Sequence, residues 1–117
     1  MKVLFDLKTT QHFIGGAAEY TRKVFYSLLN SCSFLRGEVQ ILGLIDSGIG
    51  HYAYNDLTPE SLNRLGIEFV DLKYSSFEQI IQEKNIDKVF LGCAQYLTGY
   101  DVEKISVPVV CVIHDLD

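Results

Sequence analysis

The chain has 117 residues, 48% of them hydrophobic and 21% charged, which is the range of one globular domain with a buried core. Its net charge of −5 excludes the basic surface that binds nucleic-acid backbones, and no apolar stretch is long enough to span a membrane. The three cysteines lack the spacing of a disulfide framework or a zinc site. We therefore expect a cytoplasmic protein with no signal peptide and no transmembrane segment.

The N-terminal part of the chain predicts two strands with a helix between them. Lys2 to Leu7 and Glu38 to Ile45 are short apolar runs typical of buried strands, and a polar loop from Lys8 to His12 follows the first. A helix is predicted after Gly15 and Gly16, where the residues that share its apolar face are Ala17, Tyr20, Thr21, Val24 and Leu28.

Charges on this predicted helix give it weak support. Glu19 and Lys23 are four residues apart, a spacing at which opposite charges attract on a helix surface. We expect these two side chains to form an ion pair.

The middle of the chain predicts a loop, a short helix and a third strand. Asp46 to Leu57 is polar and has no clear period, which is typical of a loop. Thr58 is a good N-cap, with Pro59 at the first helical position, and Gly66 can end the helix after Leu65. The third strand is predicted from Ile67 to Leu72.

A second helix with defined ends is predicted from Ser76 to Lys84. Ser75 and Glu78 have the spacing of a capping box, and Asn85 can end the helix in a left-handed conformation. Its expected buried face consists of Phe77, Ile80 and Ile81.

The last part of the chain predicts two more apolar strands, Asp87 to Gly92 and Val107 to Ile113. Between them one helical turn is expected near Asp101, and Pro108 lies near the start of the last strand, where a missing N–H donor has least effect.

Alternation of five apolar strands with helices predicts an α/β fold with a doubly wound, mostly parallel Rossmann-like sheet and helices on both faces. We expect residues 1–117 to form one such domain. Because only four residues follow the last predicted strand, we also expect a fragment of a larger two-domain protein.

Ligands of such sheets bind at the carboxyl ends of the strands, which directs attention to the segments Lys8 to Gly16, Gly92 to Gly99 and His114 to Asp117. In the first segment, Gly15 and Gly16 would let the backbone approach an anionic or sugar group closely, with His12 in the same loop. Taken alone, two glycines before a helix are more often a loop pair that only needs positive φ.

In the last segment, His114 and Asp115 follow directly on a strand, where either side chain could hydrogen-bond a substrate hydroxyl. His114 could instead cap the strand end, and Asp115 could begin a turn. Cys93 has no neighbour in sequence that would activate a thiol, so we interpret it as a packing or loop residue.

The opening Gly15-Gly16-Ala17-Ala18-Glu19-Tyr20-Thr21-Arg22 and the strand that ends in His114-Asp115-Leu116 resemble the acceptor-side domain of family-4 retaining glycosyltransferases of GT-B fold. The resemblance implies that Gly15 and Gly16 face the cleft between two domains, near the donor phosphates or sugar. It places His114 beside the transferred sugar, and Asp115 where it would hold that loop.

The resemblance also implies an activity for the complete protein, the retaining transfer of a hexosyl group from a nucleotide-sugar donor to an acceptor glycan or lipid-linked sugar. It implies no metal or other cofactor. The donor site would lie mostly in a C-terminal domain beyond this chain, so we expect these 117 residues alone to be inactive. Glu60 and Glu68 match the spacing of the family's paired glutamates, which we interpret as coincidence.

Two alternative functions remain open from the sequence. Asp6 and Asp71, at predicted strand ends, suggest a non-catalytic receiver-like or protein-binding α/β module, although His114 stands where a receiver has lysine. A small hydrolase using His114 would need an activated serine, and the GxSxG elbow of such enzymes is not in the sequence.

Overall fold

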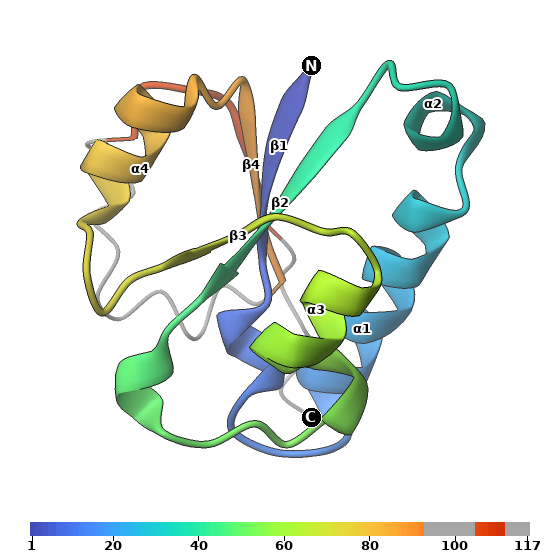
Figure 1. Ribbon diagram of the computed structural model, residues 1–117, viewed down its shortest axis with the longest axis vertical. Coiled ribbons are helices and arrows are strands. Elements are labelled where there is room, and N and C mark those ends of the chain that lie inside the picture. Colours follow the sequence, from blue (N-terminus) through green and yellow to red (C-terminus); the bar gives the residue numbers. More distant parts are fainter. Residues whose placement is uncertain (93–104, 112–117) are drawn as a thin grey trace.

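The computed structural model describes residues 1–92 and 105–111 (Figure 1). In chain order its helices and strands are β1 (Lys2–Asp6), α1 (Gly16–Leu29), α2 (Cys32–Leu35), β2 (Gln40–Ile45), α3 (Pro59–Arg64), β3 (Phe69–Asp71), α4 (Phe77–Lys84), β4 (Lys88–Leu91) and β5 (Val109–Cys111). Short 3-10 helices in the loops are η1 (Lys8–Thr10), η2 (Ser47–Ile49) and η3 (Asn55–Leu57).

The described strands form one sheet in the order β3-β2-β1-β4-β5, and every pairing between them is parallel. β1 is central, with Val3 opposite Ile41 of β2 and Lys88 of β4. The chain builds outward from β1 through β2 to β3, then crosses back to add β4 and β5 on the other side. This is the strand order of a Rossmann sheet, and it confirms the predicted α/β fold class.

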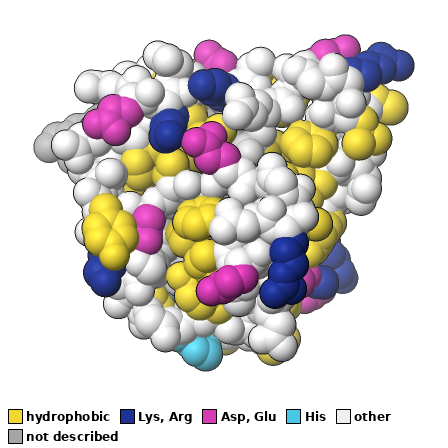
Figure 2. All heavy atoms as spheres, in the orientation of Figure 1, with side chains coloured by type: hydrophobic (Ala, Val, Ile, Leu, Met, Phe, Trp, Pro, Cys, Tyr) yellow, Lys and Arg dark blue, Asp and Glu magenta, His cyan; other side chains and the backbone are white. Residues whose placement is uncertain are grey.

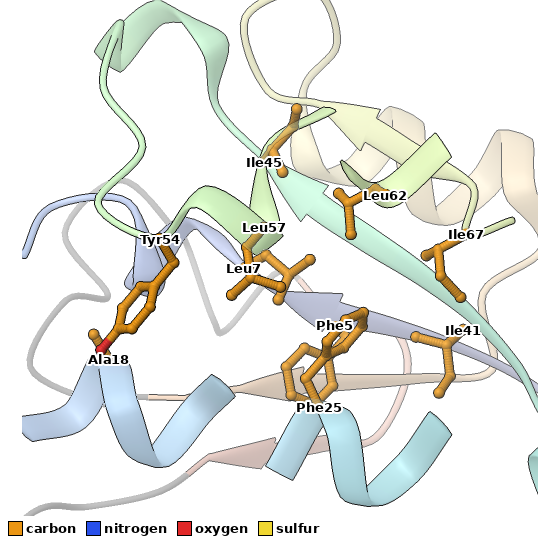
Figure 3. Close-up of a cluster of buried hydrophobic side chains, with 10 residues drawn as sticks. All are labelled: Phe5, Leu7, Ala18, Phe25, Ile41, Ile45, Tyr54, Leu57, Leu62 and Ile67. Atoms are coloured by element: carbon orange, nitrogen blue, oxygen red, sulfur yellow. The ribbon is translucent and has the colours of Figure 1, made fainter. Parts of the chain in front are cut away.

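Each face of the sheet has its own hydrophobic core, because neighbouring residues of a strand point to opposite faces. Phe5 of β1 faces α1, where its ring centroid lies 5.3 Å from that of Phe25 (Figure 3). Leu4 faces the other way and packs in a second cluster with Ile80 of α4. Figure 1 shows α1 and α3 on one side of the sheet and α4 on the other, so the sheet is doubly wound as predicted.

The buried face of α1 is rotated relative to the predicted one. Its buried residues are Ala18, Thr21 and Phe25, whereas Tyr20, predicted to face the core, is 46% exposed. Thr21 belongs to both faces and contacts the end of β4 tightly, since a Cβ atom on Gly92 would lie 2.8 Å from its Cγ2. Only glycine lets α1 approach the sheet this closely with Thr21 inward.

The predicted start of α3 is confirmed. Thr58 is its N-cap, with the side-chain oxygen accepting from the Ser61 N–H at 3.2 Å, and Pro59 is the first helical residue. Gly66 follows the helix with a φ of 72°, a left-handed conformation that favours glycine.

The capping box of α4 lies one residue later than predicted. Ser76, not Ser75, is the N-cap, and its partner is Gln79, whose side chain accepts from the Ser76 N–H at 2.9 Å. Ser75 is instead part of the turn after β3, where its N–H donates to the carbonyl of Asp71 at 3.3 Å. The left-handed end at Asn85 is confirmed, with a φ of 54°.

Short helical turns are the elements that the sequence pattern did not predict. The predicted loop from Asp46 to Leu57 contains η2 and η3, and α2 follows α1 after a cap in which Ser31 accepts from the Phe34 N–H at 3.3 Å. A single turn is too short to show a hydrophobic period, so side-chain caps and tertiary contacts decide whether it forms.

The strands are shorter than the apolar runs that predicted them. β3 has three residues, and β5 is described from Val109 to Cys111. The predicted end of the last strand at Ile113 and the helical turn near Asp101 lie outside the described residues.

Candidate functional site

The carboxyl ends of β1 and β4 lie side by side where the strand order reverses, and ligands of open α/β sheets bind outside this edge. Figure 1 shows η1, the start of α1 and the segment 46–57 after β2 at this same end of the molecule. Of the three segments predicted to carry the site, residues 8–16 and Gly92 are described, whereas 93–99 and 114–117 are outside the described residues.

Asp6, the last residue of β1, is a buried carboxylate at this reversal point, with 3% of its surface exposed. Its Oδ2 accepts a 2.6 Å hydrogen bond from Oγ1 of Thr9, and the backbone amides of Thr9, Lys8 and Gly92 also donate to it. Burial raises the pKa of Asp6, and these hydrogen bonds offset only part of that effect. Asp6 thus ties the turn after β1 to the end of β4.

Gln11 joins the loop after β1 to the segment after β2. Its side chain is 1% exposed, and its Nε2 donates to the carbonyls of Asp46 at 2.9 Å and His51 at 3.2 Å. Its Oε1 accepts from the Asp46 N–H at 2.9 Å, and its carbonyl accepts from the Ala53 N–H at 3.1 Å. No local pattern marks Gln11, because a loop glutamine ordinarily faces solvent.

Gly15 and Gly16 begin α1 in backbone conformations that favour glycine, with φ values of 102° and 54°. Gly15 is the N-cap, so no side chain caps this helix of 14 residues. Its first-turn amides lack intrahelical partners and carry the positive end of the helix dipole. A Cβ atom on Gly16 would lie 3.9 Å from Cε2 of Phe13, which is ordinary contact, so φ and not space is what favours glycine there.

Tyr54, from the segment after β2, bonds to the start of α1. Its hydroxyl accepts from the Gly15 N–H at 3.0 Å and donates to Oε2 of Glu19 at 2.9 Å. The ring is 8% exposed and lies in the core cluster with Ala18 (Figure 3). Burial raises the pKa of Tyr54, so the hydroxyl keeps its proton at neutral pH.

Arg22 of α1 links the same two segments by charge. Its guanidinium lies 2.8 Å from Oδ2 of Asp56 and 3.6 Å from Oε1 of Glu19, and it lies over the rings of Tyr26 and Tyr54. Burial alone would raise the pKa of Asp56, but hydrogen bonds from Arg22 and Tyr26 outweigh it and the net shift is downward. We call the five residues Glu19, Arg22, Tyr26, Tyr54 and Asp56 the Tyr54 network.

This network corrects one sequence expectation. Glu19 pairs with Arg22 and Tyr54, and not with Lys23 as predicted. Arg22 lies three residues after Glu19 on the same helix, whereas Tyr54 comes from the segment 46–57, at a distance in sequence that no helix-spacing rule covers. The sequence feature that points to this network is a tyrosine and an acidic residue, Tyr54 and Asp56, in a loop that follows a buried strand.

The other predicted residues lie as follows. His12 is exposed in the loop between η1 and α1, the loop that also holds Gly15 and Gly16. His114, Asp115 and Cys93 lie outside the described residues, so their predicted roles stay predictions. Glu60 is exposed in the first turn of α3, and Glu68 precedes β3 and forms an ion pair with Lys84 at 3.1 Å.

A small open pocket of about 210 Å³ lies beside the Tyr54 network, between α1 and α3, and is lined by Tyr26, Asp56, Ser61, Arg64 and Leu65. Of the predicted site residues that the structure describes, His12, Gly15 and Gly16, none lines it. Within residues 1–92 and 105–111, no three His, Cys, Asp or Glu side chains gather as metal ligands. Over the same residues, no helix is long and apolar enough to cross a bilayer.

The visible surface carries no concentration of one charge. Figure 2 shows acidic and basic side chains interspersed with hydrophobic ones on the face it draws. No protein-family model, curated protein or solved structure matches the chain. The function of the site therefore rests on its own geometry and on two sequence motifs, the Gly15-Gly16 helix start and the His114-Asp115 strand end.

Proposed function

We propose that this chain is the acceptor-side domain of a retaining glycosyltransferase of GT-B fold. The observation that carries the proposal is the position of Gly15 and Gly16. They begin a helix at the carboxyl edge of a parallel sheet of order 3-2-1-4-5, beside the point where the order reverses.

In this proposal the start of α1 faces the donor. The first-turn amides and the helix dipole stabilise negative charge on the leaving diphosphate, so the reaction needs no metal from this domain. Gly15 and Gly16 can adopt the positive φ values of this turn and carry no side chain, so the backbone can approach the sugar and phosphate closely. His12 lies in the same loop and is a further contact for the donor.

The reaction replaces one bond at the anomeric carbon by another. The bond to the diphosphate oxygen breaks, the acceptor hydroxyl oxygen bonds on the same face, and the hydroxyl proton passes to the diphosphate. His114 hydrogen-bonds the donor sugar or guides the acceptor, and Asp115 holds the loop of His114 in place. The acceptor is a glycan or a lipid-linked sugar, the second domain supplies most of the nucleotide site, and the enzyme works in the cytoplasm.

The test uses the protein together with its downstream sequence. Release of nucleoside diphosphate is measured over a panel of UDP- and GDP-sugars with sugar acceptors. His114→Ala should lower turnover roughly tenfold or more, the usual effect of losing a positioned polar group. His51→Ala is the matched control, because the His51 side chain is exposed and only its backbone carbonyl is bound by Gln11.

Two results would count against the proposal. If the wild-type protein releases no nucleotide from any donor of the panel, the glycosyltransferase function is wrong. If His114→Ala and His51→Ala both keep the wild-type rate, the enzyme class survives and His114 leaves the mechanism.

The receiver-like alternative fits this geometry less well. Receiver domains have the strand order 2-1-3-4-5, which differs from the order found here. Asp6, the carboxylate at the central strand end, is 3% exposed and already accepts bonds from Thr9, Lys8 and Gly92. Acetyl phosphate is therefore expected to leave Asp6 and Asp71 unmodified, and a mass increase of one phosphoryl group at either would favour the alternative.

A further inference from the structure

The ring of Tyr54 packs in the core cluster with Ala18 and lies under the guanidinium of Arg22, and its hydroxyl bonds one of the two glycines. We infer that Tyr54 is a positioning residue, whose hydroxyl fixes the Gly15–Gly16 turn in the conformation that binds the diphosphate of the donor. The role of Tyr54 in donor binding rests on the proposed function, whereas its fixing of the Gly15 backbone does not.

Gly15 needs an outside partner to keep one conformation. Glycine adopts positive φ freely and loses the most conformational entropy on ordering, so its own backbone does not fix the turn. Its carbonyl accepts from the Glu19 N–H at 3.4 Å, a long bond at the helix start. The bond from its N–H to the Tyr54 hydroxyl at 3.0 Å fixes the peptide plane on the other side.

The direction of the Tyr54 hydroxyl is fixed by Glu19. The hydroxyl donates its one proton to Oε2 of Glu19 at 2.9 Å, which leaves a lone pair for the Gly15 N–H. Arg22 lies 3.6 Å from the other carboxylate oxygen and holds Glu19 in turn. The three residues thus orient one acceptor toward one backbone donor.

Tyr54 can position Gly15 because its own place is set by the core. Its ring is 8% exposed and packs with Ala18 and Leu57 in the cluster between α1, α3 and the sheet. The preceding residue, Ala53, is bound through its N–H to the carbonyl of Gln11. The core and the loop after β2 therefore fix Tyr54, and Tyr54 in turn fixes the start of α1.

The first measurement concerns the hold on Gly15 and needs no substrate. Amide hydrogen exchange of Gly15 is followed by NMR in the complete protein labelled with ¹⁵N-glycine. Tyr54→Phe should speed exchange at Gly15 roughly fivefold or more, the factor that one net hydrogen bond supplies. Gly43, whose N–H donates to the Glu68 carbonyl within the sheet, reports any global loss of stability.

Tyr26→Phe is the matched control. It removes a phenol hydroxyl of the same network, which donates to Asp56 at 2.7 Å, without touching Gly15. Gly15 exchange should stay at the wild-type rate in this variant. Glu19→Gln keeps an acceptor for the Tyr54 hydroxyl and should restore most of the protection that Glu19→Ala loses.

The second measurement concerns donor binding. In the same protein Tyr54→Phe should raise the donor KM roughly fivefold with kcat nearly unchanged, and Tyr26→Phe should change neither. Unchanged Gly15 exchange in Tyr54→Phe would overturn the inference whatever the enzyme does. Faster exchange with an unchanged KM would overturn the role in donor binding alone. Faster Gly15 exchange in Tyr54→Phe, together with no nucleotide release by the wild-type protein, would confirm the hydrogen bond to Gly15 and show the proposed function to be wrong.

Discussion

Two aspartates near the carboxyl edge of the sheet, Asp6 and Asp56, have opposite surroundings. Asp6 is 3% exposed, and its hydrogen-bond partners among the described residues are neutral donors, a hydroxyl and backbone amides. Asp56 is half-buried and accepts from the guanidinium of Arg22 and from Tyr26. The pKa of Asp6 is raised by burial, whereas the pKa of Asp56 is lowered because charged and neutral donors outweigh burial.

The different surroundings of the two carboxylates indicate different structural roles at the carboxyl edge of the sheet. Neutral donors around a deeply buried carboxylate satisfy its oxygens but do not cancel its charge, so Asp6 fixes the backbone at the junction of β1 and β4. A cation beside an accessible carboxylate makes a weaker and adjustable link between α1 and the segment 46–57. The rigid junction supports the sheet, and the adjustable link borders the proposed donor site.

Asp6→Ala should have the largest effect on stability. It leaves Thr9, Lys8 and Gly92 with buried donors that lack an acceptor, so the free energy of unfolding should fall by about 3 kcal/mol. Urea unfolding followed by circular dichroism measures this loss. Asp6→Asn keeps one acceptor oxygen and removes the buried charge, so it should lose less than half as much. Equal losses in both variants would show that the charge itself is required.

The raised pKa of Asp6 also predicts how its contribution to stability changes with pH. Because the folded protein binds the Asp6 proton more tightly than the unfolded chain does, ionisation of this group costs stability above its folded pKa. The contribution of Asp6 to stability should therefore improve as pH falls through that pKa. Asp6→Asn should remove this part of the pH dependence.

Gly92→Ala should come next, at about 2 kcal/mol, because the added Cβ would overlap Oγ1 and Cγ2 of Thr21 and force α1 away from β4. Gly43→Ala is the matched control in the sheet, since its Cβ would meet mainly the flexible tip of Leu7, 2.9 Å away. Thr21→Ala should relieve most of the loss when combined with Gly92→Ala. If the stability losses of Gly92→Ala and Thr21→Ala simply add in the double variant, the predicted contact between Gly92 and Thr21 is wrong.

Asp56→Asn should have the smallest effect on stability, below about 1 kcal/mol at neutral pH, because its ion pair with Arg22 is about one-third exposed. Since the folded pKa of Asp56 lies below its ordinary value of 3.8, its stabilisation is present above 3.8 and is lost as pH falls through the folded pKa. Urea unfolding across this range should show the variant and the wild type converging in acid. A difference that stays constant in acid would rule out the ion pair as its cause.

Elements with long apolar runs or strong caps could be predicted from the sequence. The strand in Lys2 to Leu7, the Thr58 cap and the Asn85 end all depend on neighbouring residues, and all three are confirmed. The capping box of α4 was predicted one residue early, because Ser75 and Ser76 both have a suitable partner and the turn from Asp71 decides between them.

The candidate site was predictable only in part. Gly15 and Gly16 stand out in sequence because two glycines precede a helical period, and their positive φ values confirm that glycine is needed. Tyr54 and Gln11 did not stand out, because their partners are more than thirty residues away in the chain. Contacts at such separation leave no local spacing to detect.

The sequence by itself determined the fold class and the glycine-flanked start of α1, since strand burial, helix caps and backbone freedom follow from short stretches of residues. The tertiary structure alone decided the rotation of α1, its close contact with Gly92, the burial of Asp6 and the Tyr54 network. These depend on how closely elements distant in sequence approach one another, and packing around one central strand sets that distance.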